Sequence, residues 1–267
     1  MRKSLKSAAV YGAVLLVTFT AVACKKFDNS AIDLSTYEKK VFSQNGEDGV
    51  MEKIIDVIGV YNRYYVEIGT GVGTECNTRN LRENHGFTGV MMDGCCENKK
   101  INLFKEFLTK ENINDILSKY NVPEVFDVLS IDIDGNDFYI WHAFDKKYRP
   151  QLIVIEYNVT HLPGQDKVIE YKPDHVWDKT NYYGASITAL YNLGRYKGYS
   201  LVYADKRGVN LFFVRDDVLS KIENKFLNMN DVDKIYRNPK LGPGPNGGWY
   251  DDVKKRKYVT SQSILKI

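Results

Sequence analysis

Two kinds of apolar pattern follow one another along this chain. Continuous apolar runs, of the kind that a strand buried on both faces carries, predict strands at residues 64–68, 89–93, 126–132 and 150–158. Apolar residues at helical spacing predict helices at residues 43–58, 76–86, 113–120, 138–141 and 185–199. Strands that alternate with helices indicate a parallel sheet with right-handed crossovers.

The pattern changes after the last of these helices. Two apolar runs within residues 200–216 flank a polar turn at residues 206–208, which is typical of a hairpin. The predicted fold is therefore α/β: a Rossmann-like, mostly parallel sheet with helices on both faces and an antiparallel last strand. Beyond the hairpin, the sequence predicts one amphipathic helix near residues 218–227 and a glycine-rich loop around 241–249.

A long connection without periodicity separates the strand at 150–158 from the helix at 185–199. It spans residues 159–185 and contains Pro163, Gly164 and Pro173. A connection of this length inside a compact domain is usually functional, so we expect a lid or a specificity loop.

The first 26 residues differ from the rest of the chain. Basic residues flank an apolar stretch at 8–24 on both sides, which predicts a signal or membrane-anchor segment. A cleaved signal, an uncleaved anchor and a lipoprotein signal ending at Cys24 remain open. We favour an anchor, with the side of the membrane undetermined because both flanks are basic. The predicted organisation is an anchor at 1–26, a linker at 27–40, a domain at 41–216 and an extension at 217–267.

Composition narrows the choice of partners. The 267 residues, 43% of them hydrophobic, are enough for one sizeable core. A net charge of +3, with no basic stretch interleaved with aromatic residues, argues against a nucleic-acid partner. The four cysteines show no zinc-type spacing. A bridge between Cys76 and Cys95 is conceivable, but we favour small buried thiols.

The strongest chemical signal is the segment YYVEIGTGVGTE at residues 64–75. It predicts a buried strand that carries Glu67 and ends in a turn with glycines at 69, 71 and 73, at the sheet edge where α/β proteins bind ligands. A dinucleotide fingerprint requires a third glycine five positions after the first, and Thr74 stands there. The carboxylate of Glu67 would also repel a pyrophosphate. A dinucleotide cofactor is therefore disfavoured.

The order of elements resembles that of class I S-adenosylmethionine-dependent methyltransferases. The segments SQNGEDG, VEIGTGVGTECNTRNLRE, DVLSIDIDGND, VIEYN and GASITALYNLGRYKGYSLV together resemble the FkbM-like branch of that superfamily, over residues 41–216. The resemblance implies S-adenosylmethionine as the cofactor. It also implies a set of cofactor-binding residues: Glu67, Gly69, Gly71, Gly73, Asp93, Asn112 and Asp132.

Within this set the resemblance gives each position a role. Glu67 would hold the cofactor's amino group, and the glycines would let the backbone approach the ligand. Asp93 would accept both ribose hydroxyls, Asn112 would meet the adenine edge, and Asp132 would face the methionine portion. Gln44 and Asn45 would close over the cofactor from the preceding helix.

The acceptor chemistry is less sharply marked. Transfer to a hydroxyl requires a base or a metal ion, and the candidates lie at the carboxyl ends of the strands at 126–132 and 150–158. We expect Asp134 and His161 to be catalytic, and Asp134, Glu156 and Asn158 to be able to hold Mg²⁺. The segment DIDGND does not have the glycine spacing of a calcium loop. The aromatic residues Trp141, Tyr157 and Trp177 belong either to the core or to a substrate wall.

Two functions follow from these observations. The first is a membrane-anchored methyltransferase that O-methylates a sugar or another small hydroxylated acceptor. The second is a non-catalytic, membrane-tethered domain of the same fold that acts as a binding or trafficking partner.

Overall fold

The computed structural model describes residues 31–223, 225–240, 242–244 and 247–267. The predicted anchor at residues 1–26 lies outside the described residues. Among the residues that the structure describes, no helix is long and apolar enough to span a bilayer.

The chain folds into α-helices, two short 3₁₀ helices and nine strands among the described residues. In chain order they are η1 (Leu34–Thr36), α1 (Glu47–Ile58), β1 (Tyr64–Ile68), α2 (Arg79–Asn84), β2 (Thr88–Asp93), η2 (Lys99–Ile101), β3 (Leu103–Lys105), α3 (Ile113–Lys119), β4 (Val125–Ile131), α4 (Asp137–Ala143), β5 (Arg149–Glu156), β6 (Val168–Ile169), α5 (Ile187–Lys197), β7 (Tyr199–Ala204), β8 (Asn210–Arg215), α6 (Asp216–Leu219), α7 (Val232–Ile235), β9 (Tyr258–Val259) and α8 (Ser261–Leu265). The prediction of a helix near residues 218–227 is wrong, because α6 ends at Leu219 and α7 begins only at Val232.

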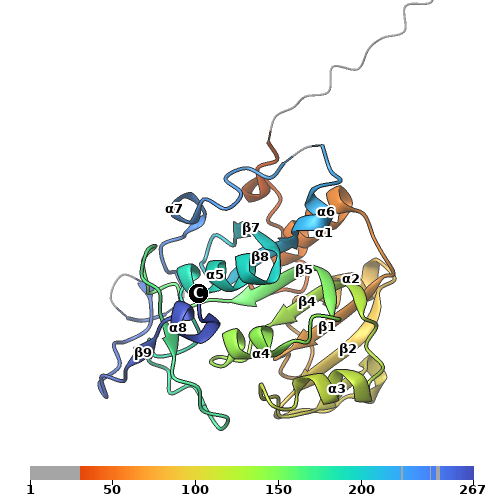
Figure 1. The fold of residues 1–267 in the computed structure, drawn as a ribbon. Helices are drawn as coiled ribbons and strands as arrows, with labels where there is room; N and C mark the ends of the chain where they lie inside the picture. Colours follow the sequence, from red (N-terminus) through yellow and green to blue (C-terminus); the bar gives the residue numbers. More distant parts are fainter. Residues whose placement is uncertain (1–30, 224, 241, 245–246) are drawn as a thin grey trace, which may run out of the picture.

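Seven strands form one sheet in the order β3-β2-β1-β4-β5-β8-β7 (Figure 1). The strands from β1 to β5 pair in parallel. Strand β8 is the last strand of this sheet in chain order. It lies between β5 and β7 and is antiparallel to both. The predicted fold class is therefore confirmed, with the antiparallel strand inserted beside β5.

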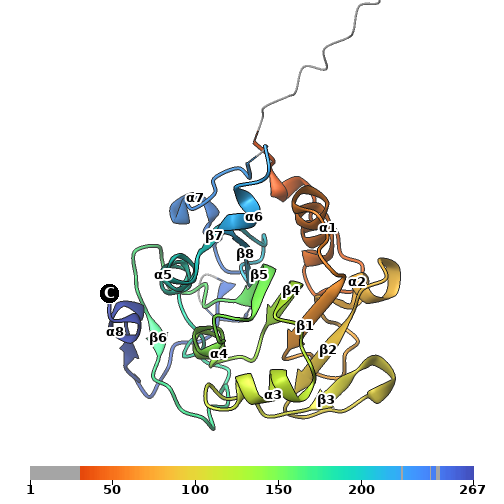
Figure 2. The same ribbon diagram turned by 45° about the vertical axis from the view of Figure 1, so that its right-hand side comes forward.

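Helices cover both faces of the sheet (Figure 2). On one face α1 and α2 bury Met51, Ile54 and Leu81 against the strands. On the other face α3, α4 and α5 bury a second apolar cluster that includes Trp141 and Leu190. Since both faces are covered, successive strand residues are buried regardless of the face to which they point, which explains the continuous apolar runs.

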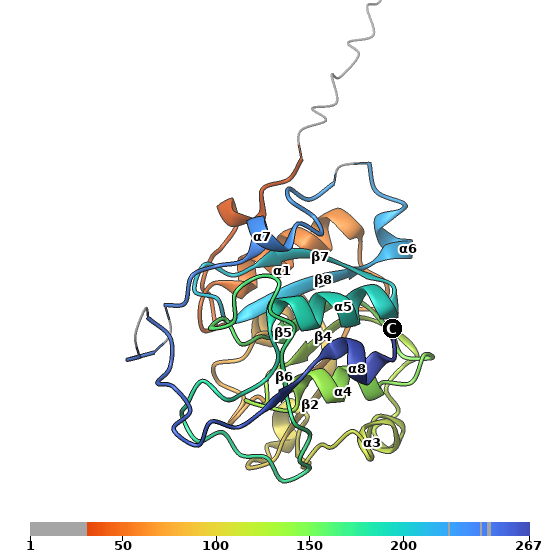
Figure 3. The same ribbon diagram turned by 60° about the vertical axis from the view of Figure 1, so that its left-hand side comes forward.

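The long loop and the C-terminal segment pack against this body. Within them, β6 and β9 pair antiparallel, and α8 lies beside α5, where the Asn192 amide donates to the hydroxyl of Ser261 at 2.9 Å (Figure 3). At the other end of the chain, the backbone of Ile32 donates to Lys225 at 2.9 Å, and Leu34 is buried. Residues 31–36, which the sequence assigns to a linker, therefore pack on the domain.

Candidate functional site

A cavity of about 920 Å³ opens at one edge of the large sheet. The parallel strands β1, β2, β4 and β5 end at this edge, and the antiparallel β8 begins there. Each strand end therefore contributes polar residues to the same space: Glu67, Asp93, Asp132, Glu156 and Asn210 all line the cavity. This is the edge at which open α/β sheets bind ligands.

The glycine turn after β1 has the backbone that the sequence predicts. Gly69, Gly71 and Gly73 all have positive φ values, of 83°, 53° and 78°. A Cβ atom at Gly69 would lie 1.6 Å from the carbonyl oxygen of Asp132, so the turn packs directly against the end of β4. At Gly71 no other heavy atom lies within 4 Å of a Cβ position, which leaves room beside the turn.

Glu67 lies beneath this turn and is only 3% exposed. Its carboxylate accepts hydrogen bonds from the backbone of Asn77 at 2.7 Å and of Thr78 at 3.0 Å, and also from the Thr78 hydroxyl. Burial raises the pKa of Glu67. In the described structure this carboxylate anchors the segment that enters α2, so it organises the turn as well as lining the cavity.

Asp93 links the end of β2 to the glycine turn. One carboxylate oxygen accepts the backbone N–H of Gly71 at 2.7 Å, and the other accepts that of Cys95 at 2.8 Å. Gln44 and Asn45 line the same cavity from the loop before α1. Asp93, Gln44 and Asn45 therefore line one cavity.

Three carboxylates converge at the ends of β4 and β5. Oxygen atoms of Asp132, Asp134 and Glu156 all lie within 4.8 Å of one another. Burial, followed by repulsion between neighbouring carboxylates, raises the pKa of Asp132 and of Glu156 well above their ordinary values. Desolvation and the charge of Asp93 raise the pKa of Asp134. One oxygen of Glu156 is buried and has no hydrogen-bond partner among the described residues.

The loop that carries two of these carboxylates is fixed by Asp137. Its carboxylate accepts the backbone N–H of Ile133 at 2.8 Å and of Gly135 at 2.9 Å, closing the turn before α4. Burial raises the pKa of Asp137 to about 6. Asp134 has a positive φ of 56°, which the Asp137 hydrogen bonds hold in place.

The cavity is strongly acidic. Of the described residues that line it, seven carry carboxylates, and Arg207 carries the one permanent positive charge. Glu75 and Glu106 form ion pairs with Lys40 and Lys119. The other five are Glu67, Asp93, Asp132, Asp134 and Glu156. Such a site attracts cations and repels phosphates and carboxylates.

Two predicted site residues, Asn112 and Asn158, do not line the cavity. The Asn112 amide is engaged within its own loop, accepting from the Thr109 backbone at 2.8 Å and donating to Phe107 at 2.9 Å, while Phe107 itself lines the cavity. Asn158 is fully buried, and its amide nitrogen donates to the carbonyls of Asn181 and Tyr183 at 2.8 Å. Asn158 therefore supports the long loop. The third member of the acid cluster is Asp132.

The structure also corrects the assignment of His161 as a general base. His161 is 5% exposed and lines a separate, smaller pocket with Lys167 and Tyr258. Burial lowers the pKa of His161 to about 3. Its ring lies 4.8 Å from that of Tyr258 in an edge-on contact, which is a packing role.

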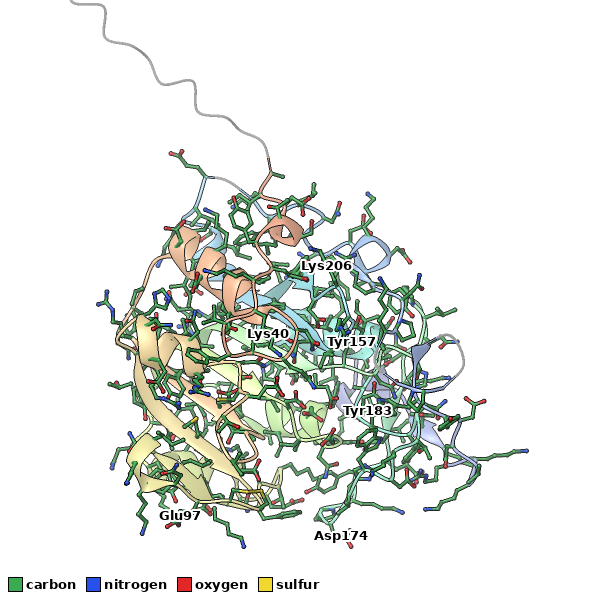
Figure 4. The ribbon with its side chains drawn as sticks, turned by 180° about the vertical axis from the view of Figure 1, so that it is seen from behind. Lys40, Glu97, Tyr157, Asp174, Tyr183 and Lys206 are labelled. Atoms are coloured by element: carbon green, nitrogen blue, oxygen red, sulfur yellow. A yellow bond between two sulfur atoms is a disulfide. The ribbon has the colours of Figure 1, made fainter. Side chains whose placement is uncertain are left out.

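Other cavity residues carry no clear signal in the sequence. His175, Trp177 and Tyr183 reach the cavity from the long loop, and Trp249 reaches it from the C-terminal segment. Tyr183 lies near the centre of the view in Figure 4, with Asp174 of the same loop at the lower edge. The length of the loop was the available signal for His175 and Tyr183, whereas Trp177 was also a candidate for a substrate wall. Trp249 lies in a stretch that the sequence assigns only to a loop.

The aromatic candidates divide between core and cavity. Trp141 and Tyr157 are fully buried in the core, whereas Trp177 lines the cavity. Cys76 is a buried free thiol, as expected, whereas Cys95 and its neighbour Cys96 form a disulfide that the sequence did not predict. A Cys76–Cys95 bridge is therefore excluded in this structure.

The fold and the cavity together define a class I methyltransferase-like α/β protein. No protein-family model and no curated protein sequence matches the chain. Among solved structures, the chain is similar to a SAM-dependent methyltransferase from Aquifex aeolicus, with a TM-score of 0.29 and 11% identity. That match covers 61% of this chain and 87% of the other. Because this likeness is distant, the class rests on the sheet order and on the antiparallel position of β8.

Proposed function

We propose that this protein is an S-adenosylmethionine-dependent methyltransferase. One observation carries the proposal: a glycine turn opens onto a cavity lined by seven carboxylates and one guanidinium group. S-adenosylmethionine carries a sulfonium, an ammonium and one carboxylate, so its net charge is positive and this cavity favours it. A dinucleotide carries a pyrophosphate, which the same carboxylates would repel.

The proposed cofactor contacts follow from the positions of the residues. Asp93 accepts the ribose hydroxyls at the end of β2, and the open side of Gly71 lets the backbone approach the ligand. Glu67 and Asp132 face the positively charged methionine portion. Phe107 and Leu108 line the cavity beyond β3 and form an apolar surface for adenine in place of Asn112.

The reaction is an in-line displacement. The acceptor oxygen bonds to the methyl carbon while the carbon–sulfur bond breaks, leaving S-adenosylhomocysteine, and the hydroxyl proton passes to Asp134. With no metal ion in the acid cluster, the raised pKa of this carboxyl makes it a stronger base than an ordinary aspartate. Alignment of donor and acceptor supplies the remaining rate enhancement.

The acid cluster also fits a hard divalent cation such as Mg²⁺. Asp132, Asp134 and Glu156 would hold it, because carboxylate oxygens are its preferred ligands and their mutual repulsion would be neutralised. The oxygen of the Asn210 amide is buried and unpartnered in the described structure, and Asn210 pairs with Glu156 across β5 and β8. The ion would polarise a bound hydroxyl and lower its pKa.

The finer assignments rest on the sequence. The resemblance to the FkbM-like branch supports a sugar or another small hydroxylated compound as the acceptor. The apolar segment at residues 8–24 supports attachment to a membrane.

A second function is favoured by one specific observation. Disulfides such as that between Cys95 and Cys96 persist in oxidising compartments, whereas S-adenosylmethionine is made in the cytosol. The second candidate is therefore a tethered binding domain that has the fold without the activity.

Isothermal titration calorimetry of the full-length protein with S-adenosylhomocysteine distinguishes the two functions. The enzyme should bind this product, and Asp93→Ala should weaken binding at least tenfold because the ribose contact is lost. Asp174→Ala is the matched control, since Asp174 is exposed on the long loop between β5 and α5 and does not line the cavity. Absence of heat at millimolar ligand would reject the methyltransferase proposal and leave the binding domain.

A further inference from the structure

Part of the cavity wall comes from outside the large sheet. Trp177 and Tyr183 belong to the loop between β5 and α5, and Trp249 belongs to the C-terminal segment. We call these three residues the aromatic wall. Trp249 lies beyond residues 41–216, to which the methyltransferase resemblance is confined, so its place in the cavity is a property of this chain's own C-terminal segment.

The rings of the aromatic wall are held in fixed positions. The Trp177 and Trp249 ring centroids lie 4.6 Å apart in an edge-to-face contact, and those of Trp177 and Tyr183 lie 6.1 Å apart. The indole nitrogen of Trp177 donates to the carbonyl of Thr180 at 2.8 Å. A wall that is ordered before a ligand arrives loses little conformational entropy on binding.

The C-terminal segment is clasped to the loop that carries the other two rings. The Arg256 guanidinium donates to Asp178 at 2.8 Å and to Asp252 at 3.0 Å. The backbone of Asn181 donates to the carbonyl of Tyr250 at 2.8 Å, directly after Trp249. The loop and the segment therefore form one structural unit, and the position of Trp249 depends on this clasp.

The aromatic wall begins beside the acid cluster. Tyr183 is 2% exposed, and its hydroxyl has no hydrogen-bond partner among the described residues. Burial, followed by the negative charge of Glu156, raises the pKa of Tyr183 well above its ordinary value. One side of the acceptor space is therefore apolar and aromatic, and the adjoining side consists of carboxylates.

We propose that the aromatic wall is the acceptor subsite, and that Trp249 is a specificity-determining residue. The subsite selects an uncharged hydroxylated acceptor with a flat apolar or aromatic face. The face packs on Trp177 and Trp249, while the hydroxyl lies at Asp134 and Glu156. An acceptor that carries a carboxylate or phosphate is rejected, because like charges placed together cost affinity. This inference rests on the proposed methyltransferase function and specifies its acceptor.

Fluorine NMR of the full-length protein labelled with 5-fluorotryptophan tests this directly. The chain has three tryptophans, and Trp141 is 1% exposed in the core, so it serves as an internal reference. The probes are phenyl β-D-glucoside and phenyl β-D-glucuronide, added with S-adenosylhomocysteine and a chelator. We expect the glucoside to shift the Trp177 and Trp249 resonances and not that of Trp141. The glucuronide should bind at least tenfold more weakly.

Variants separate a binding role from a structural one. Trp249→Leu should weaken the glucoside at least fivefold and change the affinity for S-adenosylhomocysteine less than twofold. Tyr250→Leu is the matched control, because the Tyr250 side chain is 57% exposed while its backbone makes the clasp. An unchanged Trp141 resonance shows that each variant is folded. Arg256→Ala should reproduce the effect of Trp249→Leu by loosening the clasp.

Three results would overturn the inference: no shift of either cavity tryptophan at millimolar glucoside, equal affinity for the two probes, or wild-type glucoside binding by Trp249→Leu. Binding of S-adenosylhomocysteine is measured separately. If it binds and the tryptophans do not respond, the acceptor subsite is rejected and the methyltransferase stands. If it does not bind, the methyltransferase proposal fails whatever the tryptophans show.

Discussion

The three converging carboxylates predict that Glu156→Gln makes the protein more stable. Their oxygens lie within 4.8 Å of one another. Two unit charges at that distance repel by about 3.5 kcal/mol at an effective dielectric constant of about 20, and by about 0.9 kcal/mol in water. Asp134 is exposed, so the repulsion between its carboxylate and that of Glu156 lies near the lower value. Glutamine has nearly the same shape as glutamate without its charge.

We expect the free energy of unfolding to rise by about 1–3 kcal/mol near neutral pH, which corresponds to at least about 2 °C in Tm for a chain of this size. The sign follows from the pKa. Because the pKa of Glu156 is raised in the folded protein, its charged form destabilises the fold only above the unfolded value of about 4.3. The gain should therefore shrink as the pH falls toward about 4.

Urea unfolding of the wild type and the variant across this pH range, with a chelator present, measures the difference. Glu75→Gln is the control, because Glu75 is exposed and paired with Lys40, so its removal should change stability by less than about 0.5 kcal/mol. Added Mg²⁺ should raise the Tm of the wild type and not that of Glu156→Gln. A loss of stability near neutral pH, or a gain that persists in acid, would refute the reasoning.

Three further predictions concern the turn, the buried histidine and the disulfide. Gly69→Ala should cost more than about 3 kcal/mol in urea unfolding, because its Cβ meets Asp132, whereas Gly86→Ala, in open space, should cost about 1 kcal/mol. The pKa of His161 is lowered to about 3 in the folded protein. Between about pH 6.5 and that value, the unfolded chain therefore binds a proton at His161 and the folded protein does not. His161→Gln should therefore reduce the loss of stability on acidification, and parallel pH profiles would contradict this. Mass spectrometry without reduction should find the peptide that carries Cys95 and Cys96 oxidised and unalkylated. Alkylation of both thiols without a reductant would contradict the disulfide.

Most of the large sheet could be predicted from the sequence because its signals are local. Helices on both faces bury the interior residues of β1, β2, β4 and β5 whichever face they point to, which produces the continuous apolar runs of these strands. The three-residue strand β3 is too short to carry such a signal. The six-residue helix α2 is shorter than the segment predicted for it, because its first turn is taken up by contacts to Glu67.

Two of the errors at the site, Asn158 and His161, have a common cause in the path of the chain after β5. Glu156 and Asn158 are two residues apart, so a continuing strand would place both side chains on one side. The strand ends at Glu156, and the backbone of Asn158 instead bonds to Ala185 at 2.8 Å. That turn directs Asn158 and His161 away from the acid cluster and into the support of the long loop. Sequence spacing does not reveal where a strand stops.

The sequence by itself determined the α/β class, the glycine turn and the acids at the strand ends, because each depends on neighbouring residues and on the rule that parallel strands end at one edge. Only the tertiary structure decided which polar residues meet across that edge. Asp132 joined Asp134 and Glu156, Cys95 paired with Cys96, and Trp249 entered the cavity from the C-terminal segment. These contacts join residues through loops without periodicity, and their geometry is fixed by packing and hydrogen bonds that no local pattern encodes.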